Sequence, residues 1–170
     1  MRRLILLPLV TLALVLSGCA TVQKLDAAGD VHALLIAIRD NDGPAFDRRV
    51  DRRALMREVS DRLAAEATKD PRIPAALAAL LAPGLTQLAG DALIQPGVFR
   101  AVADYYGYTP QTRIPGRIAI SQTLRELPDG RVCATRKQDG PCLLIFTKAE
   151  DGHWRLSGFE GDTSMLRLPR

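Results

Sequence analysis

The segment Arg131–Phe159 reads RVCATRKQDGPCLLIFTKAEDGHWRLSGF, and its pattern of short runs and turns decides the fold of the chain. The sequences QDGP before Cys142 and EDG before His153 are turns, and they separate three runs of strand-forming residues. The middle run, Cys142–Phe146, is continuously apolar, which predicts a central strand that is buried on both faces. Strands joined by such short turns are typical of an antiparallel meander.

The residues upstream of this segment extend the predicted sheet and then change to a helical pattern. Ile118, Ile120 and Leu124 alternate with polar residues, which is the period of a half-buried strand. From Asp26 to about Tyr106, apolar residues recur instead at helical spacing. Helices first and strands second indicate the α+β class. We therefore expect N-terminal helices packed on a C-terminal four-stranded antiparallel meander.

Turn and proline residues divide the helical part. Val31, Leu34 and Ile38 share one face of a first helix, which ends in the turn sequence of residues 40–44. Asp51 is placed to cap the N-terminus of a second helix that runs to about Ala67. Two further helical segments are expected, a proline-interrupted one over residues 75–94 and a short one from Gln95 to Tyr106.

The N-terminus has the pattern of an export signal. Arg2-Arg3 precede the apolar run Leu4–Leu16, which is shorter than the roughly 20 residues that span a bilayer. The run ends in Leu16-Ser17-Gly18-Cys19, which resembles the lipobox of bacterial lipoproteins. The alternative is an uncleaved membrane anchor in which Cys19 is an ordinary cysteine.

The lipobox resemblance implies a division of the chain and a location. Residues 1–18 would be removed as a signal peptide, Cys19 would carry lipid, residues 19–25 would form a lipidated tether, and 26–170 a single α+β domain. Ala20 follows the cysteine, where an aspartate would resemble an inner-membrane retention signal. The expected location is therefore the cell envelope, at the outer membrane and facing the periplasm.

Composition and charge narrow the class of partner. Hydrophobic residues make up 47% of the chain and charged residues 25%, as in a globular domain. The net charge of +4 falls to +2 without Arg2 and Arg3, which leaves no argument for a nucleic-acid partner. The expected partner is the membrane, reached through the lipid on Cys19, and no cofactor is expected.

With Cys19 assigned to lipid, Cys133 and Cys142 remain as an even pair in an exported chain, which favours a disulfide. They lie on adjacent predicted strands, where directly opposed Cα atoms are about 4.5–5.5 Å apart. A metal site would need further ligands, and neither His32 nor His153 has the required spacing.

Other polar clusters have ordinary structural interpretations. His32 and His153 are the only histidines, and no nucleophile motif surrounds any serine, so we expect no catalytic residue. Asp40, Asp42 and Asp47 do not fit the spacing of a calcium loop, so no metal site is expected. The arginine cluster beside them, residues 48–53, is expected to be a solvated, ion-paired face, with lipid headgroups as the alternative partner.

Three tyrosines gather where the helices give way to the sheet. Tyr105, Tyr106 and Tyr108 offer both apolar area and hydroxyl groups, which suits contact with a ligand or a partner protein. Ordinary packing is the favoured interpretation, and a ligand or partner surface is the alternative. We expect any pocket to lie near these tyrosines, between the helices and the concave face of the sheet.

Short motifs resemble a bacterial family known only as domain of unknown function 2939. They are Ala37–Asp42, Val50-Asp51, Ala54-Leu55, Gln95–Val98 and Trp154–Leu156. The resemblance would cover most of the mature chain, and it implies no activity and no catalytic residue. The expected architecture is also similar to the cone-shaped NTF2-like fold.

The sequence thus predicts a membrane-anchored envelope lipoprotein that acts as a non-enzymatic binding or structural module. Its partner would be an envelope protein or a small apolar ligand. Two alternatives stay open. One is a small periplasmic enzyme that uses a histidine and a carboxylate, and the other is an assembly subunit of an envelope complex.

Overall fold

The computed structural model describes residues 6–67, 92–105, 107–136 and 140–160. The helices are α1 (Leu6–Asp40), α2 (Gly43–Asp47), α3 (Arg52–Ala67), α5 (Pro96–Tyr105) and α6 (Arg117–Gln122). The strands are β1 (Leu124–Glu126), β2 (Val132–Thr135), β3 (Cys142–Lys148) and β4 (Trp154–Phe159). The expected helical segment 75–94 falls outside the described residues except at its last three positions.

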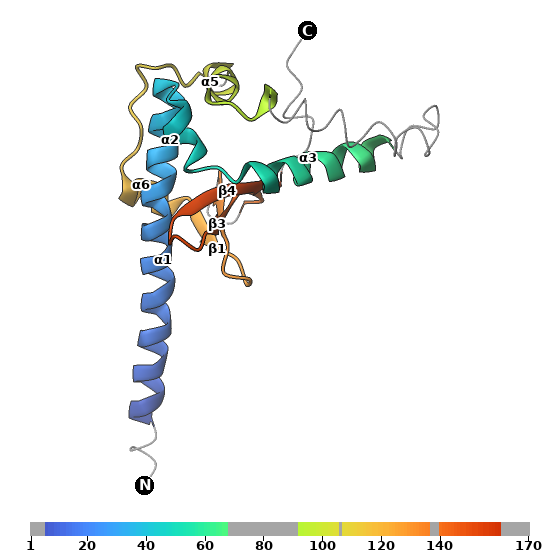
Figure 1. Cartoon of the computed structure of the whole chain (residues 1–170). Helices are drawn as coiled ribbons and strands as arrows, with labels where there is room; N and C mark the ends of the chain where they lie inside the picture. The colour runs from blue at the N-terminus through green and yellow to red at the C-terminus, as the bar shows by residue number, and fades with distance from the viewer. Residues whose placement is uncertain (1–5, 68–91, 106, 137–139, 161–170) are drawn as a thin grey trace.

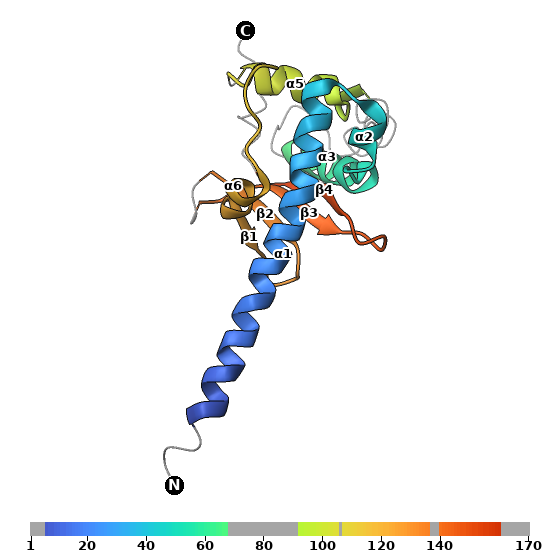
Figure 2. The ribbon, with the colours of Figure 1, turned by 90° about the vertical axis from the view of Figure 1, so that its left-hand side faces the viewer.

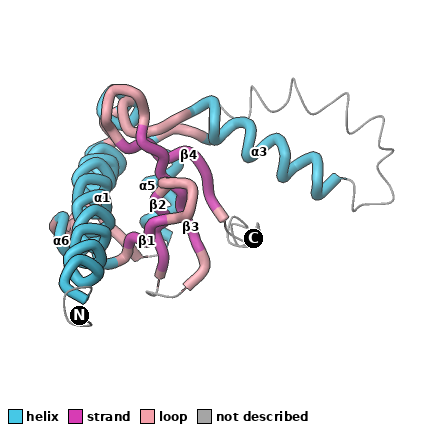
Figure 3. The backbone as a smooth tube through the Cα atoms, turned by 90° about the horizontal axis from the view of Figure 1, so that it is seen from below, coloured by secondary structure: helices cyan, strands magenta, loops and turns pink. Residues whose placement is uncertain are grey.

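The strands form one antiparallel sheet in the order β1-β2-β3-β4, which confirms the α+β class and the meander. The long helix α1 lies against this sheet, and α6 lies beside α1 (Figures 1 and 3). Helix α5 packs at the C-terminal end of α1, beyond the sheet (Figure 1). Helix α3 contacts β4 and extends away from α1 (Figure 1).

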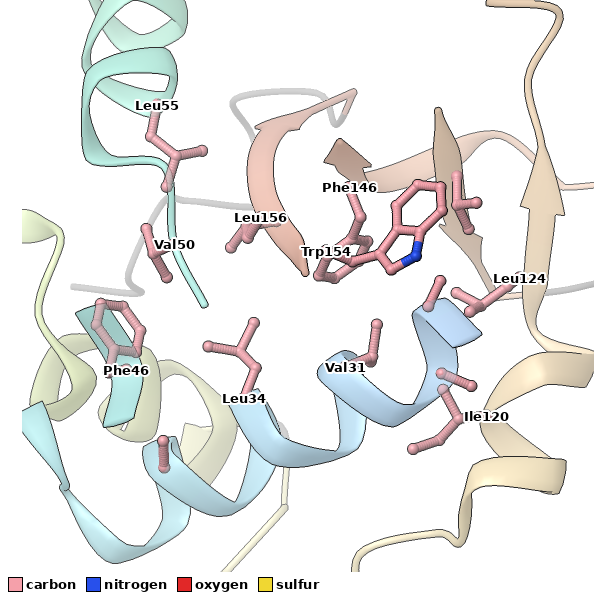
Figure 4. Packing of buried hydrophobic residues seen from close by; sticks show 14 of the residues in the cluster. Val31, Leu34, Phe46, Val50, Leu55, Ile120, Leu124, Phe146, Trp154 and Leu156 are labelled. Atoms are coloured by element: carbon pink, nitrogen blue, oxygen red, sulfur yellow. The ribbon is translucent and has the colours of Figure 1, made fainter. Parts of the chain in front are cut away.

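The core lies between α1 and the sheet. Trp154, Phe46 and Phe146 are its largest fully buried side chains. Val31 and Leu34 of α1 face them, as the helical spacing predicted (Figure 4). Burial of such side chains is the main force that holds α1 on the sheet, at roughly 1.5–3 kcal/mol for each fully buried one.

The chain between α2 and α3 protects the edge of the sheet. Val50 forms a parallel bridge with Leu156, in which Leu156 N–H donates to the Arg49 carbonyl oxygen and Asp51 N–H donates to the Leu156 carbonyl oxygen, both at 2.9 Å. Asp51 then caps α3, because its Oδ1 accepts from Ala54 N–H at 2.9 Å. The predicted N-cap therefore also closes an exposed strand edge.

The prediction of where the first strand begins is wrong. Residues 117–122 form helix α6, and strand β1 begins only at Leu124. Ile118 is 72% exposed, whereas Ile120 and Leu124, four residues apart, are both buried. Ile120 is the buried residue of α6 and Leu124 already belongs to β1, so the two are buried from different elements, and the alternation of Ile118 with Ile120 imitated a strand.

The expectation that β3 is buried on both faces holds at Ile145 and Phe146, which are adjacent and so face opposite sides of the sheet, but not along the whole strand. Ile145 and Phe146 are buried, but Leu144 is 37% exposed. Strand β3 is interior to the sheet, between β2 and β4, and this accounts for its continuous apolar run. Apolar residues do not require full burial, since much of the surface of a folded protein is apolar.

The predicted tether is not an extended linker. Residues 21–25 belong to α1, which continues through them without a break. The next residues, Ala27 and Ala28, are fully buried, so this end of the helix is already packed on the domain. The domain therefore begins within a few residues of Cys19.

Candidate functional site

The Cys19 position lies in α1, one helical turn before the first contact with the domain. Gln23 Nε2 donates a hydrogen bond to the carbonyl oxygen of Gly130, in the β1–β2 turn, at 2.8 Å. Four residues of α-helix span about 6 Å, at 1.5 Å per residue. A group attached at Cys19 is therefore held close to the β1–β2 turn.

Among the described residues, no helix has both the length and the apolar character needed to cross a membrane.

Two acids on α1 bind the start of β4. Asp26 Oδ2 accepts hydrogen bonds from Lys148 Nζ at 2.8 Å and from Trp154 Nε1 at 3.0 Å. The Lys148 bond first, and then the Trp154 bond, hold the pKa of Asp26 below its ordinary value. Asp26 is therefore ionised at neutral pH, and it fixes the orientation of the central tryptophan.

Asp30, one turn further along α1, joins three segments of the chain. Its Oδ2 accepts from Trp154 N–H at 2.7 Å, and its Oδ1 lies 3.0 Å from Arg49 Nε and 3.3 Å from His153 Nδ1. We call Asp26 and Asp30, with their partners, the acid clamp. The acid clamp was not predicted from the sequence, although two acids four residues apart on a helix face are a usable signal.

The structure brings together a histidine and a carboxylate, as the enzyme alternative required. The His153 side chain is 53% exposed and the Asp30 side chain, 12% exposed, has two further partners, but His153 lines neither of the two recesses among the described residues, near Asp40 and near Ile118. A general base needs a carboxylate or imidazole that faces a substrate site. The His153–Asp30 contact instead fastens the β3–β4 turn to α1.

His32 also has a structural contact. Its Nδ1 lies 2.9 Å from the carbonyl oxygen of Pro115, just before α6. Arg117, the first residue of α6, lies over Gly29 of α1, where an added Cβ would come within 3.0 Å of the guanidinium. The His32 contact and the close approach of Arg117 to Gly29 together hold helix α6 and the loop before it against α1.

The tyrosines lie at the C-terminal end of α5, not between the helices and the sheet. Tyr105 is 56% exposed and Tyr108 is 64% exposed, while Tyr106 is outside the described residues. Figures 1 and 2 place α5 at the C-terminal end of α1, away from the sheet. The expected location of this surface is therefore corrected, although Tyr105 and Tyr108 do form an exposed aromatic pair.

The space where a pocket was expected is filled by the core. Among the described residues, one recess of about 240 Å³ lies instead between α1 and α2, near Ala37, Asp40 and Arg48. A second, more open recess borders α6 near Ile118. Neither recess is lined by a histidine or by the described tyrosines.

The structure joins Cys133 and Cys142 in a disulfide, which agrees with the predicted pairing. Their Cα atoms are 5.5 Å apart, but they are not directly opposed as expected. Cys133 is aligned with Ile145 and Cys142 with Thr135, because the register shifts after Ala134. Both cysteines are buried. The bond joins β2 to β3, and it therefore stabilises the hairpin that these strands form.

A guanidinium lies beside the disulfide. Arg125 Nη2 is 3.4 Å from Cys142 Sγ and 4.0 Å from Cys133 Sγ. Sulfur is a weak hydrogen-bond acceptor, so these contacts orient Arg125 more than they add stability.

The remaining charged residues pair locally. Asp42 Oδ1 caps α2 by accepting from Ala45 N–H at 2.9 Å, and Asp47 Oδ1 lies 2.7 Å from Arg52 Nη2. Asp40 pairs with its neighbour Arg39 at 2.7 Å. Within the described part of the chain, no group of three or more histidine, cysteine or acidic side chains is arranged to hold a metal ion.

The arginine cluster lies far from Cys19. Arg49 pairs with Asp30, and Arg52 pairs with Asp47. Asp30 is eleven residues beyond Cys19, or about 16 Å along the helix axis. This placement favours the ion-paired interpretation of the cluster over contact with lipid headgroups at the anchor.

Comparisons with known proteins give no match to a family model, a curated protein or a solved structure. The resemblances to the lipoprotein signal, to domain of unknown function 2939 and to the NTF2-like fold therefore stay predictions.

Proposed function

We propose that this chain is a lipoprotein of the bacterial envelope, anchored in the outer membrane through lipid on Cys19, and that its domain is a non-enzymatic binding or structural module. The observation that carries the proposal is the order of the N-terminal residues: two arginines, a short apolar run, then Leu16-Ser17-Gly18-Cys19. Two or three acyl chains on one residue are enough for stable anchoring, whereas a single chain is marginal.

The beginning of the domain supports this arrangement. Only residues 20–22 separate Cys19 from Gln23, whose side chain binds the β1–β2 turn. Even when extended, four residue steps reach no more than about 14 Å, at about 3.5 Å per residue. The domain would therefore stand directly on the membrane, without a long linker.

The polar chemistry of the domain supports a non-enzymatic role. Asp30 and His153 hold α1 to the β3–β4 turn, and His32 holds the loop before α6. The exposed aromatic pair, Tyr105 and Tyr108, is the best candidate for a partner surface. Asp40, near this end of α1, lies about 30 Å along the helix axis from Cys19, so the tyrosines would face away from the membrane.

The test is metabolic labelling of the full-length chain with radioactive palmitate in cells, with and without the lipoprotein signal-peptidase inhibitor globomycin. The wild-type chain should be labelled, and globomycin should cause the uncleaved precursor to accumulate. Cys19→Ser should abolish labelling, whereas Cys133→Ser, which also removes one cysteine, should keep it. A Cys19→Ser chain that is labelled as strongly as wild type would overturn the proposal.

The binding role is tested separately by a photo-crosslinking residue at position 108 in intact cells. The expected result is one stoichiometric adduct from position 108 and none from the control position 150, which is exposed in the β3–β4 turn. The same adducts from both positions would indicate random collision and would count against the tyrosine surface.

A further inference from the structure

The part of α1 nearest Cys19 carries an apolar strip that the fold does not cover. Val22 is 69% exposed and Leu25 is 40% exposed. Residues three apart on a helix lie on the same face, so these two side chains are neighbours. One turn further on, the same face of α1 is covered at Gly29 by Arg117 of α6. The exposed strip therefore begins where the cover of α6 ends.

The β1–β2 turn lies at the same level as this strip. Gln23, between Val22 and Leu25 in sequence, holds Gly130 of the turn by its side-chain bond. The turn residues Pro128, Asp129 and Gly130 are exposed. Figure 1 shows this turn as the part of the sheet region that reaches furthest toward the N-terminal end of α1. Strip and turn lie at the same level along the axis of α1, on different sides of the helix, and together we call them the basal surface (Val22, Leu25 and Pro128–Gly130).

The charges around the basal surface are compatible with an anionic neighbour. Asp26 is paired with Lys148 at 2.8 Å, and Asp129 is paired with Arg131 at 2.7 Å. Each of these carboxylates therefore has a cation beside it, which weakens its repulsion of the phosphate groups of lipids. Lys24 lies in the same helical turn as Val22 and adds a positive charge.

We propose that the basal surface contacts the phospholipid headgroup layer, so that the anchored domain is held in one orientation. The inference rests on the proposed lipid anchor at Cys19. Along the helix axis Val22 is about 4.5 Å and Leu25 about 9 Å from Cys19. The headgroup region adds about 5–7 Å to each side of the hydrocarbon core, so Val22 lies within this layer and Leu25 at its outer edge.

The contact fixes the orientation of the domain on the membrane. With the basal surface on the lipid, α1 stands out of the membrane and its C-terminal end, with α5, is furthest from the lipid (Figures 1 and 2). Tyr105 and Tyr108 would then be presented to the periplasm at a fixed height. A purely flexible tether would present every face of the domain to the membrane in turn.

The test uses full-length lipidated protein in vesicles of phosphatidylethanolamine and phosphatidylglycerol, with and without bromine on the acyl chains. Three tryptophan reporters are compared: Val22→Trp, Leu25→Trp and, as the matched control on an exposed residue, Tyr108→Trp. The native Trp154 is 1% exposed and supplies a constant background. The reporter at 22 should lose most of its added emission in brominated vesicles, the reporter at 25 should lose less of it, and the reporter at 108 should keep it.

Equal quenching at 22, 25 and 108, or no quenching at any of them, would overturn the fixed orientation. Pro128→Trp is a second reporter that is independent of α1, and it should be quenched with Val22→Trp. Palmitate labelling of the same samples separates the two proposals. A chain without palmitate removes the anchor and this inference together, whereas a labelled chain with unquenched reporters removes only this inference.

Discussion

Near residues 23–30, α1 is held to the sheet region by hydrogen bonds and ion pairs of its own side chains. Gln23, Asp26 and Asp30 bind the two turns at one end of the sheet. Near residues 34–46, the C-terminal part of α1 and the helix α2 are held by buried apolar side chains. There the Phe46 and Phe99 rings meet edge to face, with 5.3 Å between their centroids. The polar end (residues 23–30) therefore specifies the position of α1 on the sheet, while the apolar end (residues 34–46) contributes more to the free energy of unfolding.

The physical reason is the difference in the two kinds of contact. A hydrogen bond replaces one that the unfolded chain makes with water, so its net contribution is only about 0.5–1.5 kcal/mol. Burial of an aromatic ring has no such offset. Hydrogen bonds are directional, however, and the acid clamp places Trp154 and the β3–β4 turn at defined positions on α1.

The largest expected effect comes from breaking the apolar end. Phe46→Ala removes a fully buried ring and should lower the free energy of unfolding by about 3–5 kcal/mol, measured by urea denaturation. Tyr108→Ala, at the neighbouring but exposed position, should change it by less than about 0.5 kcal/mol. Similar losses for both variants would show that the apolar end is not the more stabilising one.

The next effect comes from the far end of the sheet, where the Cys133–Cys142 disulfide closes the β2–β3 hairpin. Reduction should lower the free energy of unfolding by about 2–3 kcal/mol in the chain-entropy account of a loop of this size. The measurement is urea denaturation with and without a phosphine reductant. A chain with both Cys133→Ala and Cys142→Ala should be insensitive to the reductant.

Breaking the acid clamp should have a smaller effect than breaking the apolar end. Asp30→Ala removes the acceptor of the partly buried Trp154 N–H. It should lower the free energy of unfolding, measured by urea denaturation, by about 1–3 kcal/mol. Asp40→Ala removes an exposed acid of the same helix that pairs only with its neighbour Arg39, and should cost close to nothing. A loss for Asp30→Ala that equals the loss for Phe46→Ala would contradict the comparison.

The smallest expected effect is the pH dependence of the stabilisation that the polar end contributes. Because the pKa of Asp26 is lower in the folded chain than its ordinary value of 3.8, ionised Asp26 stabilises the fold above that value, and this is lost as the pH falls through the folded pKa. Asp26→Asn should therefore have a smaller drop in urea midpoint between about pH 7 and about pH 3 than wild type. Asp61→Asn, at an exposed position of α3, serves as the control and should keep the wild-type drop.

Much of the architecture could be predicted from local patterns. The turn EDG, the strands after Leu124, the buried face of Val31 and Leu34, and the capping by Asp51 all depend on residues close in sequence. Helix α6 was missed because two isoleucines at alternate positions imitate a strand, and six residues are too few to separate the two periods. The helical form of the predicted tether was missed because nothing in residues 21–25 shows that the next turn of α1, with Ala27 and Ala28, is buried.

The site was harder to predict than the fold. Asp26 and Asp30 are two ordinary helix acids until Trp154, more than a hundred residues later, is placed beside them. The tyrosines were noted from their spacing in the sequence, but the position of Tyr105 at the end of α5 depends on how α5 packs on α1. Contacts between residues far apart in the chain leave no periodic signal in the sequence.

By itself the sequence determined the fold class, the order and turns of the strands, the cysteine pair and the lipobox pattern at Cys19, because each depends on residue type at short spacing. Only the tertiary structure decided that α1 is locked to both turns of the sheet within a few residues of Cys19, and that Val22 and Leu25 are left uncovered beside the β1–β2 turn. These features arise when Gln23, Asp26 and Asp30 meet partners from the other end of the chain, and long-range packing alone sets that geometry.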